Sequence, residues 1–301
     1  MFPLTGNRFA AENNRGKSTQ SGPMNRKRFI EKVLQKERVP GHVKKIFLSA
    51  EIIASLAKIP PLSSVHPWFK ADRTDMRWLP INEDIELPDS APAPLELLER
   101  FIDEASHRVI FEACGCRTAF QCERHPQDIG CLLMGDSALE SPPSISREVG
   151  PDEAKEHMHR AVEAGLVPMV GKARVDNWIF GIKDRRRMLT TCFCCDCCCM
   201  SRYERFFPVS KLDELFPRID GIRVEVTDDC DGCGDRGEAC AERCYIRAIE
   251  VVDGRPRITD ACRACGRCAI ACPAHAIRVS IEEEEFLDKS YERIVSQVRH
   301  Y

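Results

Sequence analysis

The chain has 301 residues, of which 30% are charged and 18 are cysteine, and its formal net charge is −3. Disulfide frameworks belong to small secreted domains, so clustered cysteines in a chain of this length indicate metal sites and a reducing, cytoplasmic location. No stretch reaches the roughly 18 consecutive apolar residues that a membrane-spanning helix needs. We therefore expect neither a disulfide scaffold nor a membrane-spanning protein.

The N-terminal arm, residues 1–45, is strongly basic, with eleven lysines and arginines against three acidic residues. Its first part, residues 1–24, is rich in polar residues and glycine and is predicted to be a disordered tail. A basic arm also suits docking onto an acidic partner or peripheral attachment to an anionic membrane surface. No basic–aromatic stacking pattern accompanies it, so no nucleic-acid partner is expected.

Residues 25–107 are predicted to form a helical region. The pattern of apolar residues favours helices over 25–38, 43–58 and 95–107. Prolines break the segment between the second and the third helix. That segment contains Trp68 and Trp78, which we expect to fill the core rather than to bind a cofactor.

Residues 108–220 are predicted to form a cysteine-rich metal-binding region that contains a helix at 151–165 and a hairpin of 167–170 with 177–182. Four cysteines in the pattern C-x-C-x5-C-x8-C open the region. We call them the first cysteine group: Cys114, Cys116, Cys122 and Cys131. Interleaved glycines indicate a loop folded around a metal. We expect a third iron–sulfur cluster there, with a tetrahedral zinc site as the alternative because four thiolates suit zinc equally well.

A second cysteine-rich segment follows near the end of the same region. This cysteine run has six cysteines within eight residues: Cys192, Cys194, Cys195, Cys197, Cys198 and Cys199. Disulfides between such near neighbours are strained, so we expect four of the six to bind metal, and the spacing does not decide which four. The run could supply a fourth cluster, share ligands with the first cysteine group, or form a labile metal centre with spare thiols.

Residues 221–281 carry the most specific motifs of the chain. One reads C-x2-C-x2-C-x3-C-P and consists of Cys262, Cys265, Cys268, Cys272 and Pro273. The other, upstream, reads C-x2-C-x6-C-x3-C and consists of Cys230, Cys233, Cys240 and Cys244. The residues that follow each fourth cysteine also repeat, which predicts two half-domains related by a pseudo-twofold axis.

On these motifs the segment resembles the bacterial-type two-cluster ferredoxin domain. The resemblance implies two 4Fe–4S clusters, each held by three cysteines of one motif and the last cysteine of the other. One cluster would be bound by Cys230, Cys233, Cys240 and Cys272. The second cluster would be bound by Cys262, Cys265, Cys268 and Cys244. This chain departs from the family in the longer spacer at 234–239 and in Tyr245, which replaces the usual proline.

Residues 81–200 with this domain also resemble a cysteine-rich iron–sulfur protein family of anaerobes, in which the same two upstream patterns precede a dicluster domain. That resemblance implies metal binding at the upstream cysteines and no defined activity. Residues 282–301 are predicted to form a C-terminal helix. Its inward-facing residues would be Leu287, Tyr291, Ile294 and Val298.

The sequence therefore predicts an α+β fold: a mainly helical N-terminal region with cysteine-rich loops, followed by a ferredoxin-like pseudo-twofold dicluster domain. It contains none of the hydrolase, metalloprotease, phosphate-loop or flavin motifs. We expect an electron-transfer protein or subunit that passes single electrons to or from a partner redox enzyme or another carrier. The alternatives are an enzyme with a substrate-accessible cluster and a redox or metal sensor that uses the cysteine run.

Overall fold

The computed structural model describes residues 93–173, 180–233, 239–282 and 285–299, together with residues 52, 54–59, 70, 72, 74–80 and 301. The predicted tail at 1–24, the predicted helix at 25–38 and Trp68 lie outside the described residues. Of the predicted helix at 43–58, residues 52, 54 and 55 are described as helical, and a 3-10 turn, η1, follows at Leu56–Lys58.

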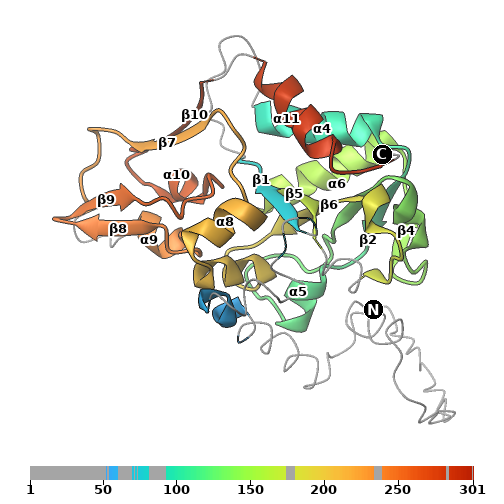
Figure 1. The fold of residues 1–301 in the computed structure, drawn as a ribbon. Coiled ribbons are helices and arrows are strands. Elements are labelled where there is room, and N and C mark those ends of the chain that lie inside the picture. The colour runs from blue at the N-terminus through green and yellow to red at the C-terminus, as the bar shows by residue number, and fades with distance from the viewer. Residues whose placement is uncertain are drawn as a thin grey trace, which may run out of the picture.

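A six-stranded sheet forms the centre of the larger part of the molecule (Figure 1). In sheet order its strands are β1 (Asp75–Trp78), β5 (Val167–Lys172), β6 (Leu189–Cys194), β3 (Leu132–Met134), β2 (Arg108–Phe111) and β4 (Ser146–Glu148). Every neighbouring pair is antiparallel. The fold is therefore α+β, and most of the sheet lies within the region at 108–220, for which the sequence predicts only one helix and one hairpin.

The predicted hairpin differs from the observed pairing. Strand β5 pairs with β1 on one side and with β6 on the other. Of the expected second strand at 177–182, residues 180–182 are described, and they belong to no strand. The physical reason is that residues 167–171 are all buried, and the backbone N–H and C=O groups of a buried strand need hydrogen-bond partners on both sides.

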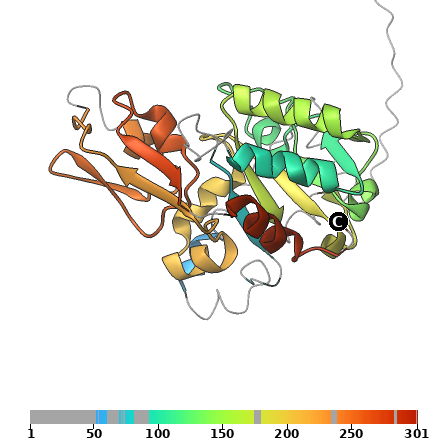
Figure 2. The ribbon, with the colours of Figure 1, turned by 90° about the horizontal axis from the view of Figure 1, so that it is seen from above.

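Three helices form a layer over one face of the sheet (Figure 2). They are α4 (Ala93–Glu104), α6 (Pro151–Glu163) and α11 (Phe286–Val295). These helices fall at the predicted positions 95–107, 151–165 and 282–301. Helix α4 contacts both α6 and α11, and Phe101 stacks on Tyr291 with ring centroids 5.2 Å apart. The C-terminal helix thus returns to cover the sheet, with Tyr291 and Ile294 buried.

Short helices and loops cover the opposite face. They are α5 (Gly115–Ala119), η3 (Asp136–Glu140), η4 (Arg185–Arg187), η5 (Met200–Phe206) and α8 (Val209–Leu215). A second core forms where Ala119 of α5 and Ala138 of η3 pack with Val109, Phe111 and Leu133 of the sheet. Cys114 lies directly before α5, so the first cysteine group begins at this second core.

The C-terminal unit, residues 222–281, consists of two β–helix–β halves (Figure 1, orange). The first half contains β7 (Ile222–Val226), α9 (Ala239–Arg243) and β8 (Ile249–Val252). The second contains β9 (Arg255–Ile258), α10 (Arg267–Ala271) and β10 (Ile277–Ile281). Each of the two small sheets takes one strand from each half, since β7 pairs with β10 and β8 pairs with β9. This order of elements follows the internal repeat of the sequence.

One core cluster joins the sheet, its helical layer and the C-terminal unit. It includes Trp78 and Phe101 as well as Cys240, Cys268 and Cys272. The C-terminal unit therefore packs as a continuation of the sheet core. Across the part of the chain that is described, no helix is both long and apolar enough to cross a membrane.

Candidate metal centres

The eight C-terminal cysteines line two hollows in the C-terminal unit. The first hollow is lined by Cys230, Cys233, Cys240 and Cys272. The second hollow is lined by Cys244, Cys262, Cys265 and Cys268. These are the two sets that the ferredoxin resemblance implies. Four thiol donors per hollow, among apolar side chains such as Val251 and Ile258, fit a buried 4Fe–4S cluster.

Each of two short helices carries or directly precedes two cysteines, one for the first hollow and one for the second. Cys240 lies on α9 and Cys244 directly follows that helix, while Cys268 lies on α10 and Cys272 directly follows it. Residues four apart on a helix are separated by about 6 Å along its axis. Helices α9 and α10 also contact each other. The same two short helices therefore border both hollows.

Backbone N–H groups donate to sulfur at equivalent positions of the two halves. The Ala248 N–H donates to Cys244 Sγ at 3.1 Å, and the Ala276 N–H donates to Cys272 Sγ at 3.3 Å. The preceding residues, Arg247 and His275, both have left-handed backbones, with φ of 58° and 50°. Non-glycine residues seldom adopt this conformation, so its repetition marks a required turn. Hydrogen bonds to sulfur are one means by which a protein sets a cluster's reduction potential.

Burial makes several of these thiols weaker acids than an ordinary cysteine. It is the largest cause of the raised pKa of Cys265, which reaches about 12, and of the raised pKa of Cys244. Burial also raises the pKa of Cys240 and Cys268. Metal binding displaces the thiol proton, so metal is the natural counterion for thiolates in such surroundings.

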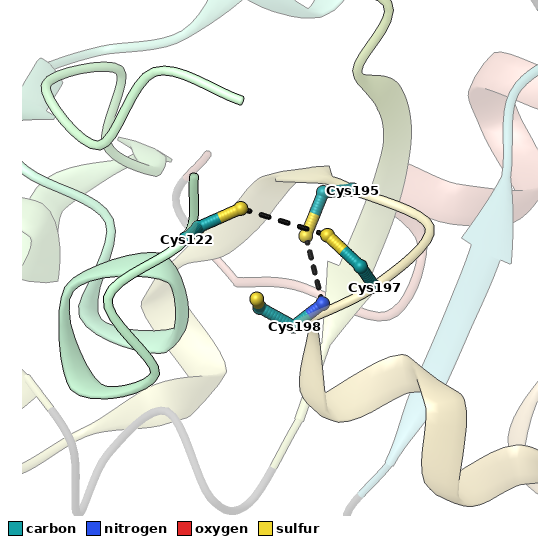
Figure 3. A group of neighbouring side chains, drawn as sticks. All are labelled: Cys122, Cys195, Cys197 and Cys198. Atoms are coloured by element: carbon teal, nitrogen blue, oxygen red, sulfur yellow. Dashed lines mark hydrogen bonds between the residues drawn. The ribbon is translucent and has the colours of Figure 1, made fainter. Parts of the chain in front are cut away.

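Upstream, the structure gathers cysteines from two distant segments into a compact thiol group (Figure 3). Its members are Cys122, Cys195, Cys197 and Cys198. All four Sγ atoms lie within 4.8 Å of one another, and those of Cys122 and Cys197 are 3.5 Å apart. The Cys198 N–H donates to Cys195 Sγ at 3.2 Å. One cysteine of the first cysteine group thus joins three of the cysteine run.

Polar and charged side chains contact Asp196, which lies between Cys195 and Cys197 in the chain. Its carboxylate contacts His125 Nε2 at 3.0 Å, Arg124 at 3.0 Å and Arg243 of α9. Burial opposes ionisation of Asp196, but the hydrogen bonds from His125 and Arg243 and the charge of Arg124 outweigh it and lower the pKa to about 2. Asp196 is therefore ionised at neutral pH and joins the loop at 122–125 to the C-terminal unit.

Four other cysteines form a chain of sulfur contacts, which we call the thiol chain. Cys116 hydrogen-bonds with Cys114 at one side and with Cys199 at the other. The Sγ atoms of Cys199 and Cys194 are 3.0 Å apart. Hydrogen bonds with Cys116 and Cys194 hold the pKa of Cys199 well below its ordinary value. The thiol chain again combines two cysteines of the first cysteine group with two of the cysteine run.

The last two upstream cysteines, Cys131 and Cys192, face each other with their sulfurs 3.9 Å apart. Strands β3 and β6 are antiparallel with Leu132 opposite Thr191, so Cys131, directly before β3, falls opposite Cys192 of β6. The structure therefore distributes the first cysteine group among three neighbourhoods. A single centre bound by all four of its members stays a prediction, and the geometry favours sharing of ligands between the two upstream segments.

Arg117 holds the first cysteine group against β6. Its side chain is 1% exposed and donates to the carbonyls of Pro126 at 2.6 Å, of Phe193 at 2.7 Å and of Ile129. Two of these carbonyls belong to the loop between Cys122 and Cys131, and the third belongs to β6. The fork of guanidinium donors thus fixes both cysteine segments to each other.

A buried group that the motifs do not reveal joins the C-terminal unit to the sheet. Trp78 of β1 donates from Nε1 to Glu204 Oε2 at 3.1 Å, and its ring lies 5.4 Å from that of Tyr245. Arg267 lies over both rings and donates to the Cys194 carbonyl. Tyr245 is the residue that replaces the proline of the ferredoxin family, and that departure is the sequence signal for this group.

Replacing Glu204 with glutamine is expected to reduce the pH dependence of stability. Burial is the largest cause that raises the pKa of Glu204 from 4.5 to about 8. Between these values the folded protein keeps a proton that the unfolded chain has lost, so stability falls as the pH rises, by about 1.4 kcal/mol per pH unit. Glu204→Gln never ionises and keeps an acceptor for Trp78.

Thermal unfolding of anaerobically purified protein at several pH values checks this prediction. The Tm advantage of Glu204→Gln should grow from about pH 5 to about pH 8 and then level off, as the raised pKa requires. The exposed Glu156→Gln on α6 is the matched control and should show no such trend. A Tm difference that is constant over this range would contradict a protonated Glu204 in the folded protein.

Comparison with known protein families identifies part of the second half of the C-terminal unit. Residues 256–278 match the family model of a 4Fe-4S binding domain. The matched segment contains four cysteines: Cys262, Cys265, Cys268 and Cys272. The match and the grouped cysteines together support iron–sulfur binding by this protein. No curated protein and no solved structure matches the chain.

Proposed function

We propose that this protein transfers single electrons through two 4Fe–4S clusters held in its C-terminal unit, as a component of an oxidoreductase system. The first hollow holds one cluster and the second hollow holds the other. The observation that carries the proposal is the crossed distribution of cysteines, in which α9 and α10 each contribute to both hollows. A bound cluster supplies a centre that accepts or releases one electron at a time.

The chain's own residues account for the properties that a carrier needs. Helices α9 and α10 border both hollows and contact each other, which suits electron exchange between two neighbouring clusters. Apolar side chains form part of the walls of both hollows, and the N–H groups of Ala248 and Ala276 donate to cluster-binding sulfurs. Exclusion of water and hydrogen bonds to sulfur both adjust reduction potentials. The structure can therefore set the two potentials separately.

The path for electrons extends toward the sheet. Arg267 lies on α10 between Cys265 and Cys268 of the second hollow, and its guanidinium reaches the carbonyl of Cys194 in the thiol chain. We place a further metal centre in the upstream cysteine region, with ligands drawn from the thiol chain. Such a centre would connect the C-terminal unit with the sheet side of the molecule.

The redox partner in this proposal is an enzyme or another electron carrier. The basic arm at 1–45 serves as the docking element, either for an acidic partner or for an anionic membrane surface at the cytoplasmic side. Docking by charge would speed association and would weaken as ionic strength rises.

Iron and sulfide analysis combined with EPR tests the proposal on anaerobically purified full-length protein. We expect at least about eight irons with matching sulfide per chain, and a reduced EPR spectrum broadened by coupling between neighbouring clusters. A redox titration should then show reversible one-electron steps. Fewer than about four irons, or clusters that decompose on one-electron reduction, would contradict a role as an electron carrier.

A further inference from the structure

We propose that the compact thiol group binds one Zn²⁺ ion. Its four ligands are Cys122, Cys195, Cys197 and Cys198. The site differs in kind from the two hollows, because it takes a single ion rather than a cluster. It also combines two segments that the sequence analysis treats as separate centres.

Sulfur spacing is the first argument for a single ion. Four thiolates around one tetrahedral zinc, with bonds of about 2.3 Å, lie about 3.8 Å from one another. The four Sγ atoms of the compact thiol group all fall within 4.8 Å, and the Cys122–Cys197 pair is at 3.5 Å. A change of no more than about 1 Å in any sulfur–sulfur distance therefore produces a closed tetrahedral site.

A cubane cluster would need a wider arrangement, since each of its thiolates binds a different iron. Among the described residues, the cysteines that line the two hollows form no group as compact as this one. The different spacing of the cysteines therefore distinguishes the two hollows from the compact thiol group. The hollows suit clusters, and the compact thiol group suits one ion.

Surrounding groups supply the second argument. Four thiolates on a divalent ion leave a net charge of about −2, which needs compensation. Arg124 and Arg243 reach the site through Asp196, and Cys195 Sγ accepts the N–H of Cys198. His125 and Asp196 also lie near Cys197, but they hydrogen-bond with each other at 3.0 Å. They are therefore partners in the surrounding network rather than ligands.

A four-thiolate site leaves no open position on the metal, so its role is structural. Cys122 lies between α5 and β3, and the other three ligands connect β6 to η5. The ion would fasten these loops to each other beside Asp196, which in turn binds Arg243 of the C-terminal unit. Zinc would thereby fix the position of the C-terminal unit against the sheet.

Metal analysis and X-ray absorption test the site on the whole chain, purified anaerobically from cells grown with iron and zinc. We expect about one zinc per chain, with four sulfur neighbours at about 2.3 Å. Cys197→Ala should lose the zinc and keep its iron. The matched control Cys131→Ala, from the same segment as Cys122, should keep the zinc.

Absence of zinc from the unaltered protein overturns the inference, as does zinc with oxygen or nitrogen neighbours. Loss of about four irons from Cys197→Ala also overturns it, because a cluster would then occupy the site. The absorption measurement needs no variant, so it decides even where Cys197→Ala fails to fold. Zinc content is independent of electron transfer, so failure of this inference is distinguishable from failure of the proposed function.

Discussion

Combining Cys230→Ala with Cys272→Ala is expected to remove no more iron than Cys230→Ala alone, about four atoms per chain. Both cysteines line the first hollow, although they come from different motifs. Loss of one ligand already removes the cluster, so loss of a second ligand from the same cluster adds nothing. Iron and sulfide per chain, measured on anaerobically purified variants, provide the test.

The matched control exchanges only the second substitution. Cys230→Ala combined with Cys262→Ala affects both hollows and should remove about eight irons. If the Cys230 and Cys272 pair also loses about eight irons, as many as the Cys230 and Cys262 pair, then each motif holds its own cluster. The crossed assignment would then be wrong.

Arg117→Met is expected to lower the free energy of unfolding by about 3 to 5 kcal/mol. The buried guanidinium donates to three carbonyls, and methionine fills the space without a donor. Each carbonyl left unpaired in the interior costs about 1 to 3 kcal/mol. The lost hydrogen bonds join the loop of the first cysteine group to β6, so metal retention at the compact thiol group should decline as well.

Urea unfolding under anaerobic conditions measures this effect. Arg117→Lys offers one donor group in place of a fork and should show an intermediate loss. Arg160→Met, at an exposed position on α6, is the control and should change stability by no more than about 0.5 kcal/mol. If Arg117→Met behaves like the control, then the three carbonyls have other donors, and Arg117 does not fasten the two cysteine segments.

The sequence by itself determined those features that depend on local spacing. The cysteines of a 4Fe–4S motif lie close together in the chain, so Cys262, Cys265 and Cys268 are recognisable from their spacing, and the internal repeat predicts a second set. The helices α4, α6 and α11 are predictable for a similar reason. Their apolar faces repeat at helical spacing, and Pro151 begins α6 at the position that proline favours.

Only the tertiary structure decided how the upstream cysteines group. Cys122 meets Cys195 and Cys197 because β3 and β6 are neighbours in the sheet, and pairing of distant strands leaves no local spacing signal. The same holds for Glu204, which is buried beside Trp78 by the packing of η5 against β1. Ligand motifs are local and can be read along the chain, whereas composite sites and buried charges depend on which strands lie side by side.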